Sequence, residues 1–198
     1  MNIVCLGCSY TVGMPPNNWY NWPEKLASLR PNDKIYNLAI GGSSLLSSCY
    51  ILKEFSKILT PDKVIFQITH PHRFTSIKHI DFSSLENKDN YFKLDPSIRS
   101  TSDVMTITPG DTSLRWSKVY EKIKFAKHYY RFYSHELGNL EHEILKNVAR
   151  EKSNISFTWD EVPDEAKLNT IDEAGHFDNL GHDIIGEWVN NELERNIH

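Results

Sequence analysis

The sequence contains few cysteines, no long apolar run and no excess of positive charge. Of its 198 residues only three are cysteines, Cys5, Cys8 and Cys49. That is too few for a disulfide framework, and the odd number indicates reduced thiols. No segment approaches the roughly 20 apolar residues that a membrane-spanning helix requires. The first residues lack the basic region and the longer apolar stretch of a signal peptide. The sequence therefore predicts a cytoplasmic protein with no membrane partner.

The charge balance also argues against a nucleic-acid partner. Lys and Arg together number 22 and Asp and Glu 26, which gives a formal net charge of −4, so the surface as a whole does not attract polyanions. Hydrophobic residues make up 39% of the chain and charged residues 24%, proportions that are typical of a folded globular protein. A chain of this length can bury one core. We expect a single domain over residues 1–198, and the sequence leaves its oligomeric state open.

The first third of the chain alternates predicted strands and helices. Short apolar runs at residues 2–6, 34–39 and 64–69 have the composition of buried strands. Residues 19–29 have apolar positions at helical spacing, residues 44–59 begin with small hydroxyl residues typical of a helix start, and a proline follows each segment. A β-α-β-α-β order with short connections predicts a parallel sheet covered by helices. We therefore expect an α/β fold, a three-layer α/β/α sandwich on a mainly parallel sheet of about five strands.

The remainder of the chain is less regular. Residues 70–113 contain several prolines and many polar residues without a clear period, and we expect an irregular insertion there. A long, aromatic-rich helical pattern covers residues 115–150, a further strand is expected at 154–159, and an amphipathic helix at 179–195 closes the chain. The sequence indicates no role for residues 70–150.

Three polar motifs lie where the carboxyl ends of the predicted strands converge. Residues 7–13 (Gly-Cys-Ser-Tyr-Thr-Val-Gly) follow the first strand and are expected to form a loop that carries Ser9. Residues 37–43 (Asn-Leu-Ala-Ile-Gly-Gly-Ser) follow the second strand, and backbone N–H groups of their glycines can donate to a developing oxyanion. Residues 172–182 place His176 before the last helix, with carboxylates three and four residues upstream. These residue types are those of a serine nucleophile with a histidine base. A small-residue turn after a first strand is also typical of nucleotide- and phosphate-binding folds, so it is the combination of the three motifs that favours the nucleophile.

These motifs resemble the sequence blocks of the SGNH (GDSL-like) hydrolase family. The family's first block is Gly-Asp-Ser with a glycine four residues after the serine. Gly7, Ser9 and Gly13 match it, while Cys8 replaces the aspartate. The second block carries an oxyanion-hole glycine, and the resemblance gives this role to Gly42.

The family's last block has a histidine followed six residues later by the histidine of a Gly-His pair. His176, Gly181 and His182 keep that spacing. We expect His176 to be the base, because His182 falls inside the predicted last helix, where a packing or capping role is more common. The family's catalytic acid precedes the histidine by three residues, where this chain has Glu173, with Asp172 one residue further upstream.

The resemblance implies an SGNH-hydrolase-like domain with a flavodoxin-like strand order and a serine esterase activity. Ser9 would attack an ester carbonyl, His176 would accept its proton, and Glu173 or Asp172 would orient the imidazole. Backbone N–H groups of Ser9 and Gly42 would receive the oxyanion. The reaction would need no metal and no organic cofactor. The substrate would be a small O-acyl ester, with an acetylated carbohydrate as an example.

The third block of the family, Gly-x-Asn-Asp, has no counterpart after the third predicted strand. The chain instead has Thr69, His70, Pro71, His72 and Arg73 there. The missing asparagine completes the family's oxyanion hole, and loss of one such donor costs about 10²–10³-fold in rate. We expect a polar side chain of this segment to replace it, His72 or Arg73 having the longest reach. His70 and His72 alone do not make a metal site, because further ligands are not identified.

Two alternatives to the esterase remain open at this point. The chain has the features of a non-catalytic binding or structural module with the same fold, in which the altered third block has disabled the oxyanion hole. The second alternative is an O-acyltransferase that uses the same Ser-His pair. A fluorophosphonate that labels Ser9 would exclude the first, and transfer in excess of hydrolysis would identify the second.

Overall fold

The computed structural model describes residues 1–13, 20–69, 74–77, 80, 82–94, 104–107, 138–172 and 175–195. Within them the chain is an α/β protein with a six-stranded sheet of order β5-β6-β2-β1-β3-β8 and a separate two-stranded sheet, β4-β7. The strands are β1 (Asn2–Leu6), β2 (Lys34–Asn37), β3 (Lys63–Gln67), β4 (Phe74–Ile77), β5 (Glu86–Lys88), β6 (Tyr91–Lys93), β7 (Val104–Ile107) and β8 (Ile155–Phe157).

The large sheet is mainly parallel, as predicted. The central strand β1 pairs in parallel with β2 and β3, which in turn pair in parallel with β6 and β8, respectively. Only β5 is antiparallel, and it pairs with β6 at one edge of the sheet. The strand order differs from the expected flavodoxin-like order, which would place every later parallel strand beyond β3. Here β8 lies beyond β3, but β6 lies on the opposite side, next to β2.

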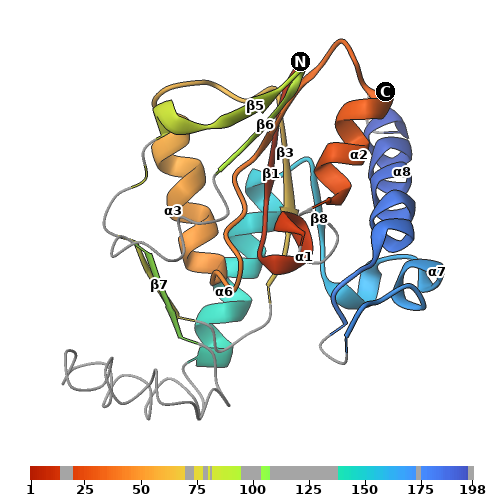
Figure 1. Ribbon diagram of the computed structural model, residues 1–198. Helices are drawn as coiled ribbons and strands as arrows, with labels where there is room; N and C mark the ends of the chain where they lie inside the picture. The colour runs from red at the N-terminus through yellow and green to blue at the C-terminus, as the bar shows by residue number, and fades with distance from the viewer. Residues whose placement is uncertain are drawn as a thin grey trace.

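Helices cover both faces of the large sheet (Figure 1). On one face lie α2 (Trp22–Leu29) and α8 (Asn179–Arg195), which run side by side. On the other lie α3 (Leu45–Phe55) and α6 (Gly138–Lys152). Because successive strand residues point to opposite faces, β3 contributes Ile65 to the core under α2 and α8, and Val64 and Phe66 to the core under α3 and α6.

Side-chain caps begin the helices α2 and α3. The Asn21 side chain accepts a hydrogen bond from the backbone N–H of Glu24 at the start of α2 (3.0 Å). Ser44 accepts one from the backbone N–H of Ser47 at the start of α3 (3.2 Å). Each cap satisfies an N–H group that has no partner within its helix.

The short helices are α1 (Ser9–Val12), α7 (Asp164–Lys167), η1 (Phe82–Ser84) and η4 (Trp159–Glu161).

Two sequence predictions are wrong in this region of the fold. The residues after β1 were predicted to be a loop, but they form the helical turn α1 (Ser9–Val12). The predicted irregular insertion at 70–113 contains β6, which extends the main sheet next to β2, and β5, which pairs with β6. Of the helix predicted at 115–150, the structure describes only the part that belongs to α6, and residues 115–137 lie outside the described ranges.

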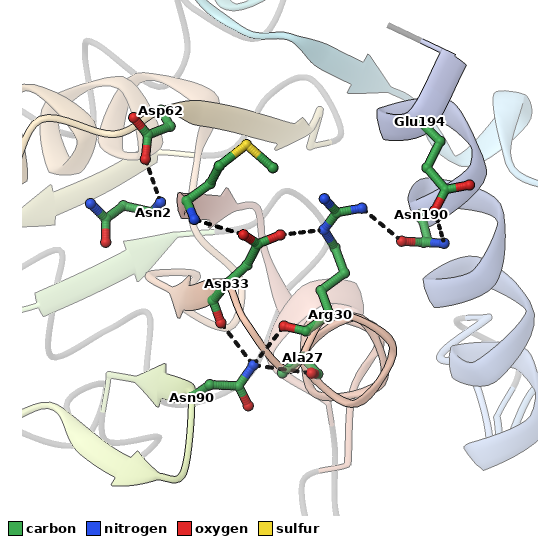
Figure 2. Close-up of polar contacts among 9 residues, drawn as sticks. Asn2, Ala27, Arg30, Asp33, Asp62, Asn90, Asn190 and Glu194 are labelled. Carbon is green, nitrogen blue, oxygen red and sulfur yellow. Dashed lines mark hydrogen bonds and ion pairs between the residues drawn. The ribbon is translucent and has the colours of Figure 1, made fainter. Parts of the chain in front are cut away.

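A polar network fastens the sheet at the amino ends of its strands (Figure 2). The Asp33 carboxylate contacts the backbone nitrogen of Met1 and Nε of Arg30, both at 2.6 Å. The Asn90 side-chain nitrogen lies within 3.1 Å of the carbonyl oxygens of Ala27, Arg30 and Asp33. These contacts join the end of α2 to β1 and to the β5–β6 turn. The polar motifs lie at the opposite end of the strands, beyond their carboxyl ends.

Candidate active site

Ser9 lies directly beyond the carboxyl end of β1, as the first residue of α1. The turn is anchored to β3 through Gln67, whose Oε1 accepts hydrogen bonds from the Cys8 backbone N–H (3.4 Å) and the Thr11 hydroxyl (3.0 Å). The close approach requires glycine at position 7, because a Cβ there would lie 2.3 Å from Thr11 Oγ1 and 2.8 Å from Gln67 Oε1. Gln67 therefore fixes the turn that carries Ser9 on the neighbouring strand.

Ser9, His176 and Asp172 form one connected chain of polar contacts. Ser9 Oγ lies 2.9 Å from His176 Nε2, although the two residues are 167 positions apart in the sequence. On the other side of the ring, His176 Nδ1 lies 2.6 Å from Asp172 Oδ2. These distances and their order along the imidazole match the requirement for a nucleophile, a base and an orienting acid.

The loop that carries His176 is shaped by Asp172 and Gly175. Asp172 Oδ1 accepts a hydrogen bond from the backbone N–H of His176 (3.0 Å), and its carbonyl accepts one from the N–H of Gly175 (3.0 Å). Gly175 has φ +79°, and a Cβ there would lie 3.2 Å from the ring of Trp159. Glycine tolerates this left-handed conformation where other residues are strained. The Asp172 side chain therefore holds both the imidazole and the backbone that carries it.

The second histidine of the motif, His182, has a different environment. It lies in α8, is 1% exposed, and its ring is in edge contact with the rings of Tyr20 and Phe177. Burial lowers the pKa of His182 to about 4, because it penalises the charged form. Its Nδ1 has no hydrogen-bond partner among the described residues. The structure thus places His176, and not His182, at the Ser9 hydroxyl.

The remaining predicted site residues are only partly accounted for. Glu173 and His72, together with His70 and Arg73, lie outside the described residues. Gly42 is buried and has φ +72°. The next residue, Ser43, donates a hydrogen bond from its hydroxyl to the carbonyl oxygen of Gly7 (2.8 Å). That bond brings the 37–43 loop to the turn that carries Ser9.

Thr69 follows β3, where the SGNH resemblance would place the third block. It is 2% exposed, and its hydroxyl is buried without a hydrogen-bond partner among the described residues. In the parallel register Leu6 pairs with Phe66, so Thr69 and Ser9 each lie three residues beyond a paired position. Strand pairing continues past β3, since the N–H of Ile68 donates to the carbonyl of Phe157 (2.7 Å). By alternation Thr69 then lies on the same face of the sheet as Gln67.

A cavity of about 210 Å³ lies beside these residues. It is bounded by Gln67 and Thr69 at the end of β3, by Lys146 of α6, and by Trp159 and Asp160 after β8. A larger cavity of about 370 Å³ lies between α3 and α6 and includes no residue of the Ser9 turn in its lining. The smaller cavity shares Gln67, which anchors the Ser9 turn, and Trp159, which packs against Tyr10, with the surroundings of the candidate site.

Sequence reasoning missed the residues that support the site. Gln67 could have been noticed as a polar residue at the end of an otherwise apolar strand. Tyr10, Trp159 and Phe177 form an aromatic cluster whose centroids are 4.7–5.8 Å apart, and Tyr10 also stacks on His176. Nothing in their spacing predicts that cluster. Trp22 is fully buried in the core and packs against Phe157, so it does not line the site.

Comparison with known proteins adds no family assignment. No protein-family model matches the chain, and no curated protein matches it significantly. Among the described residues, no group of three or more His, Cys, Asp or Glu side chains is arranged to hold a metal ion. The helices in the described ranges are all too short or too polar to cross a membrane. Function is therefore inferred from the site itself.

Proposed function

We propose that the chain is a serine esterase of the SGNH type, which hydrolyses a small O-acyl ester through an acyl-enzyme. The observation that carries the proposal is the chain of contacts from Ser9 Oγ to His176 Nε2 (2.9 Å) and from His176 Nδ1 to Asp172 Oδ2 (2.6 Å). A serine hydroxyl alone is a weak nucleophile, and an adjacent base held by a carboxylate activates it. The blocks that resemble the SGNH family support the same assignment.

The geometry supports a two-step reaction. As Ser9 Oγ attacks the ester carbonyl, its proton passes to His176 Nε2. The tetrahedral intermediate then collapses, the bond to the alcohol breaks, and the alcohol takes the proton from His176. A water molecule attacks the acyl-enzyme with His176 again as base, which releases the carboxylic acid and restores Ser9. Asp172 keeps the imidazole in the orientation that presents Nε2 to the serine and stabilises the imidazolium.

The oxyanion formed in both steps needs donors near Ser9. We assign this role to the backbone N–H groups of Ser9 and Gly42, and to the hydroxyl of Thr69 in place of the family's asparagine. A buried hydroxyl without a hydrogen-bond partner is energetically costly, and the Thr69 hydroxyl has no partner among the described residues. Oxyanion donors are most effective in such a site, where water is excluded.

The neighbouring cavity supports a small substrate. Its volume of about 210 Å³ is below the range of roughly 300–1,000 Å³ that holds drug-sized ligands. Trp159, which lines the cavity, also packs against Tyr10, whose ring lies against His176. The cytoplasmic location expected from the sequence remains part of the proposal, and the three cysteines are all free thiols.

Hydrolysis of p-nitrophenyl acetate tests the proposal. Wild-type protein should release p-nitrophenol, Ser9→Ala should reduce the rate to that of the buffer, and Ser28→Ala should leave it unchanged. Ser28 is a suitable control because it is an exposed serine of α2 whose hydroxyl bonds within its own helix. Equal rates for wild type and Ser9→Ala would contradict the esterase. Product that increases severalfold when glycerol is added would indicate an acyltransferase.

A further inference from the structure

The ring of Tyr10 lies against the imidazole of His176 and has no part in the proton transfers described above. The two ring centroids are 5.1 Å apart, and their planes are inclined by 30°. Tyr10 follows Ser9 directly in α1 and is 5% exposed. One short helix therefore carries both the proposed nucleophile and the ring that packs on the proposed base.

Tyr10 is itself held by rings from two other segments. Its centroid lies 5.2 Å from that of Trp159, which follows β8, and 5.8 Å from that of Phe177. Trp159 and Phe177 stack on each other at 4.7 Å. Because side chains in such a cluster are closely packed, Tyr10 cannot move away from His176 without opening contacts on its other sides.

His176 needs a restraint of this kind. Its side chain is 17% exposed, and an imidazole on a loop can rotate about two side-chain bonds. Asp172 holds one ring nitrogen and Ser9 contacts the other, but neither contact fixes the plane of the ring. Among the described residues, Asp172 contacts the His176 ring, and His182 interacts with it electrostatically. An aromatic face within about 6 Å also attracts a cation, which His176 becomes when it accepts the proton.

We propose that Tyr10 is a positioning residue for His176. The Tyr10 ring holds the imidazole in the orientation in which Nδ1 faces Asp172 and Nε2 faces Ser9. The same ring stabilises the imidazolium that forms when the Ser9 proton moves to Nε2. This inference rests on the proposed role of His176 as the base. Tyr10 itself exchanges no proton and touches no reacting atom.

Two substitutions separate the ring of Tyr10 from its hydroxyl. Tyr10→Phe keeps the aromatic face, whereas Tyr10→Met fills much of the same space without one. With p-nitrophenyl acetate, Tyr10→Met should lower kcat by about three- to tenfold with KM unchanged, the size of effect expected for a cation–π contact. Tyr10→Phe should stay within about twofold of wild type. Equal kcat values for the two variants, or a loss confined to KM, would overturn the proposal.

A second measurement does not depend on turnover. In ¹⁵N-histidine-labelled protein carrying Ser9→Ala, the proton on Nδ1 of His176 should give a resolved low-field NMR signal, because it faces Asp172. That signal should persist with Tyr10→Phe and broaden or vanish with Tyr10→Met. An unchanged signal with Tyr10→Met would refute the positioning role even if Ser9 proves to be the nucleophile. If circular dichroism shows Tyr10→Met to be unfolded, Trp159→Leu should broaden the signal by loosening Tyr10, and an unchanged signal there would also refute it.

Discussion

The burial of His182 predicts that the protein loses stability in mild acid. Burial in α8 lowers the pKa of this imidazole from its ordinary value of 6.5 to about 4 in the folded protein. The nearby carboxylates of Asp178 and Asp183 oppose the shift, and His176 adds to it, but burial is the largest cause. The folded state therefore keeps His182 neutral under conditions in which the unfolded chain already binds a proton.

The size and sign of the effect follow from the two pKa values. The unfolded chain binds a proton at His182 as the pH falls through 6.5, while the folded protein does so only near pH 4, so stability is complete above about pH 6.5 and falls below it. The total loss is about 3 kcal/mol, since each unit of pKa difference is worth about 1.4 kcal/mol. About 2 kcal/mol of it arises between pH 7 and pH 5.

Urea unfolding of wild type and His182→Leu measures this contribution. Leucine removes the titrating group and leaves an apolar side chain of similar size next to Phe177. The free energy of unfolding of wild type should fall by about 2 kcal/mol more than that of the variant between pH 7 and pH 5. All other titrating groups are common to both proteins and cancel in the comparison. Identical changes in the two proteins would refute the assignment of His182 as a buried, neutral histidine.

Three further predictions concern the candidate site, each with p-nitrophenyl acetate as the substrate. His176→Gln should abolish turnover, whereas His182→Gln should retain it in the folded protein; the reverse would show that the wrong histidine was assigned. Asp172→Asn should lower kcat by about 10²–10⁴-fold, because it removes the acid that orients the imidazole, and Glu173→Gln should leave kcat unchanged. A fall in kcat with Glu173→Gln alone would show that Glu173, and not Asp172, orients the imidazole. Thr69→Val should lower kcat by about 10–10³-fold through loss of an oxyanion donor, while Thr69→Ser should retain most of the wild-type kcat. Full activity of Thr69→Val would show that the hydroxyl takes no part in the reaction.

The parts of the fold that follow from local pattern could be predicted from the sequence. β1, β2, β3 and β8 are short apolar runs, and α8 has a clear amphipathic period, so each was found within a few residues of its true bounds. The pairing of β1 with β3 also agrees with the expected flavodoxin-like order at the centre of the sheet, where the third strand lies next to the first.

The missed elements are too short to show a period, or depend on contacts with residues far along the chain. The helical turn α1 has four residues, too few to show a period. β5 and β6 have three residues each, and their turn includes Asp89 with φ +56°. That turn is held by Asn90, which reaches the carbonyl oxygens at the end of α2. A pattern read along one segment cannot reveal partners that lie about 60 residues away.

The candidate site, like the fold, could be predicted only in part from the sequence. The order of the motifs was sufficient to pair Ser9 with His176, because the carboxyl ends of parallel strands converge at one edge of the sheet. Spacing could not separate Asp172 from Glu173. The contact of Asp172 with Nδ1 and its hydrogen bond from the backbone N–H of His176 favour Asp172. Likewise, nothing in the sequence marks the Thr69 hydroxyl as buried without a partner among the described residues.

Labelling with a fluorophosphonate, followed by peptide mapping, tests the central claim most directly. The reagent reacts with a serine only where a base activates the hydroxyl, so it reports the Ser9–His176 pair independently of the natural substrate. We expect one equivalent of label, located on Ser9, and no label on the His176→Gln variant. A folded protein that remains unlabelled, or one labelled at another serine with Ser9 untouched, would contradict the assignment of Ser9 as an activated nucleophile.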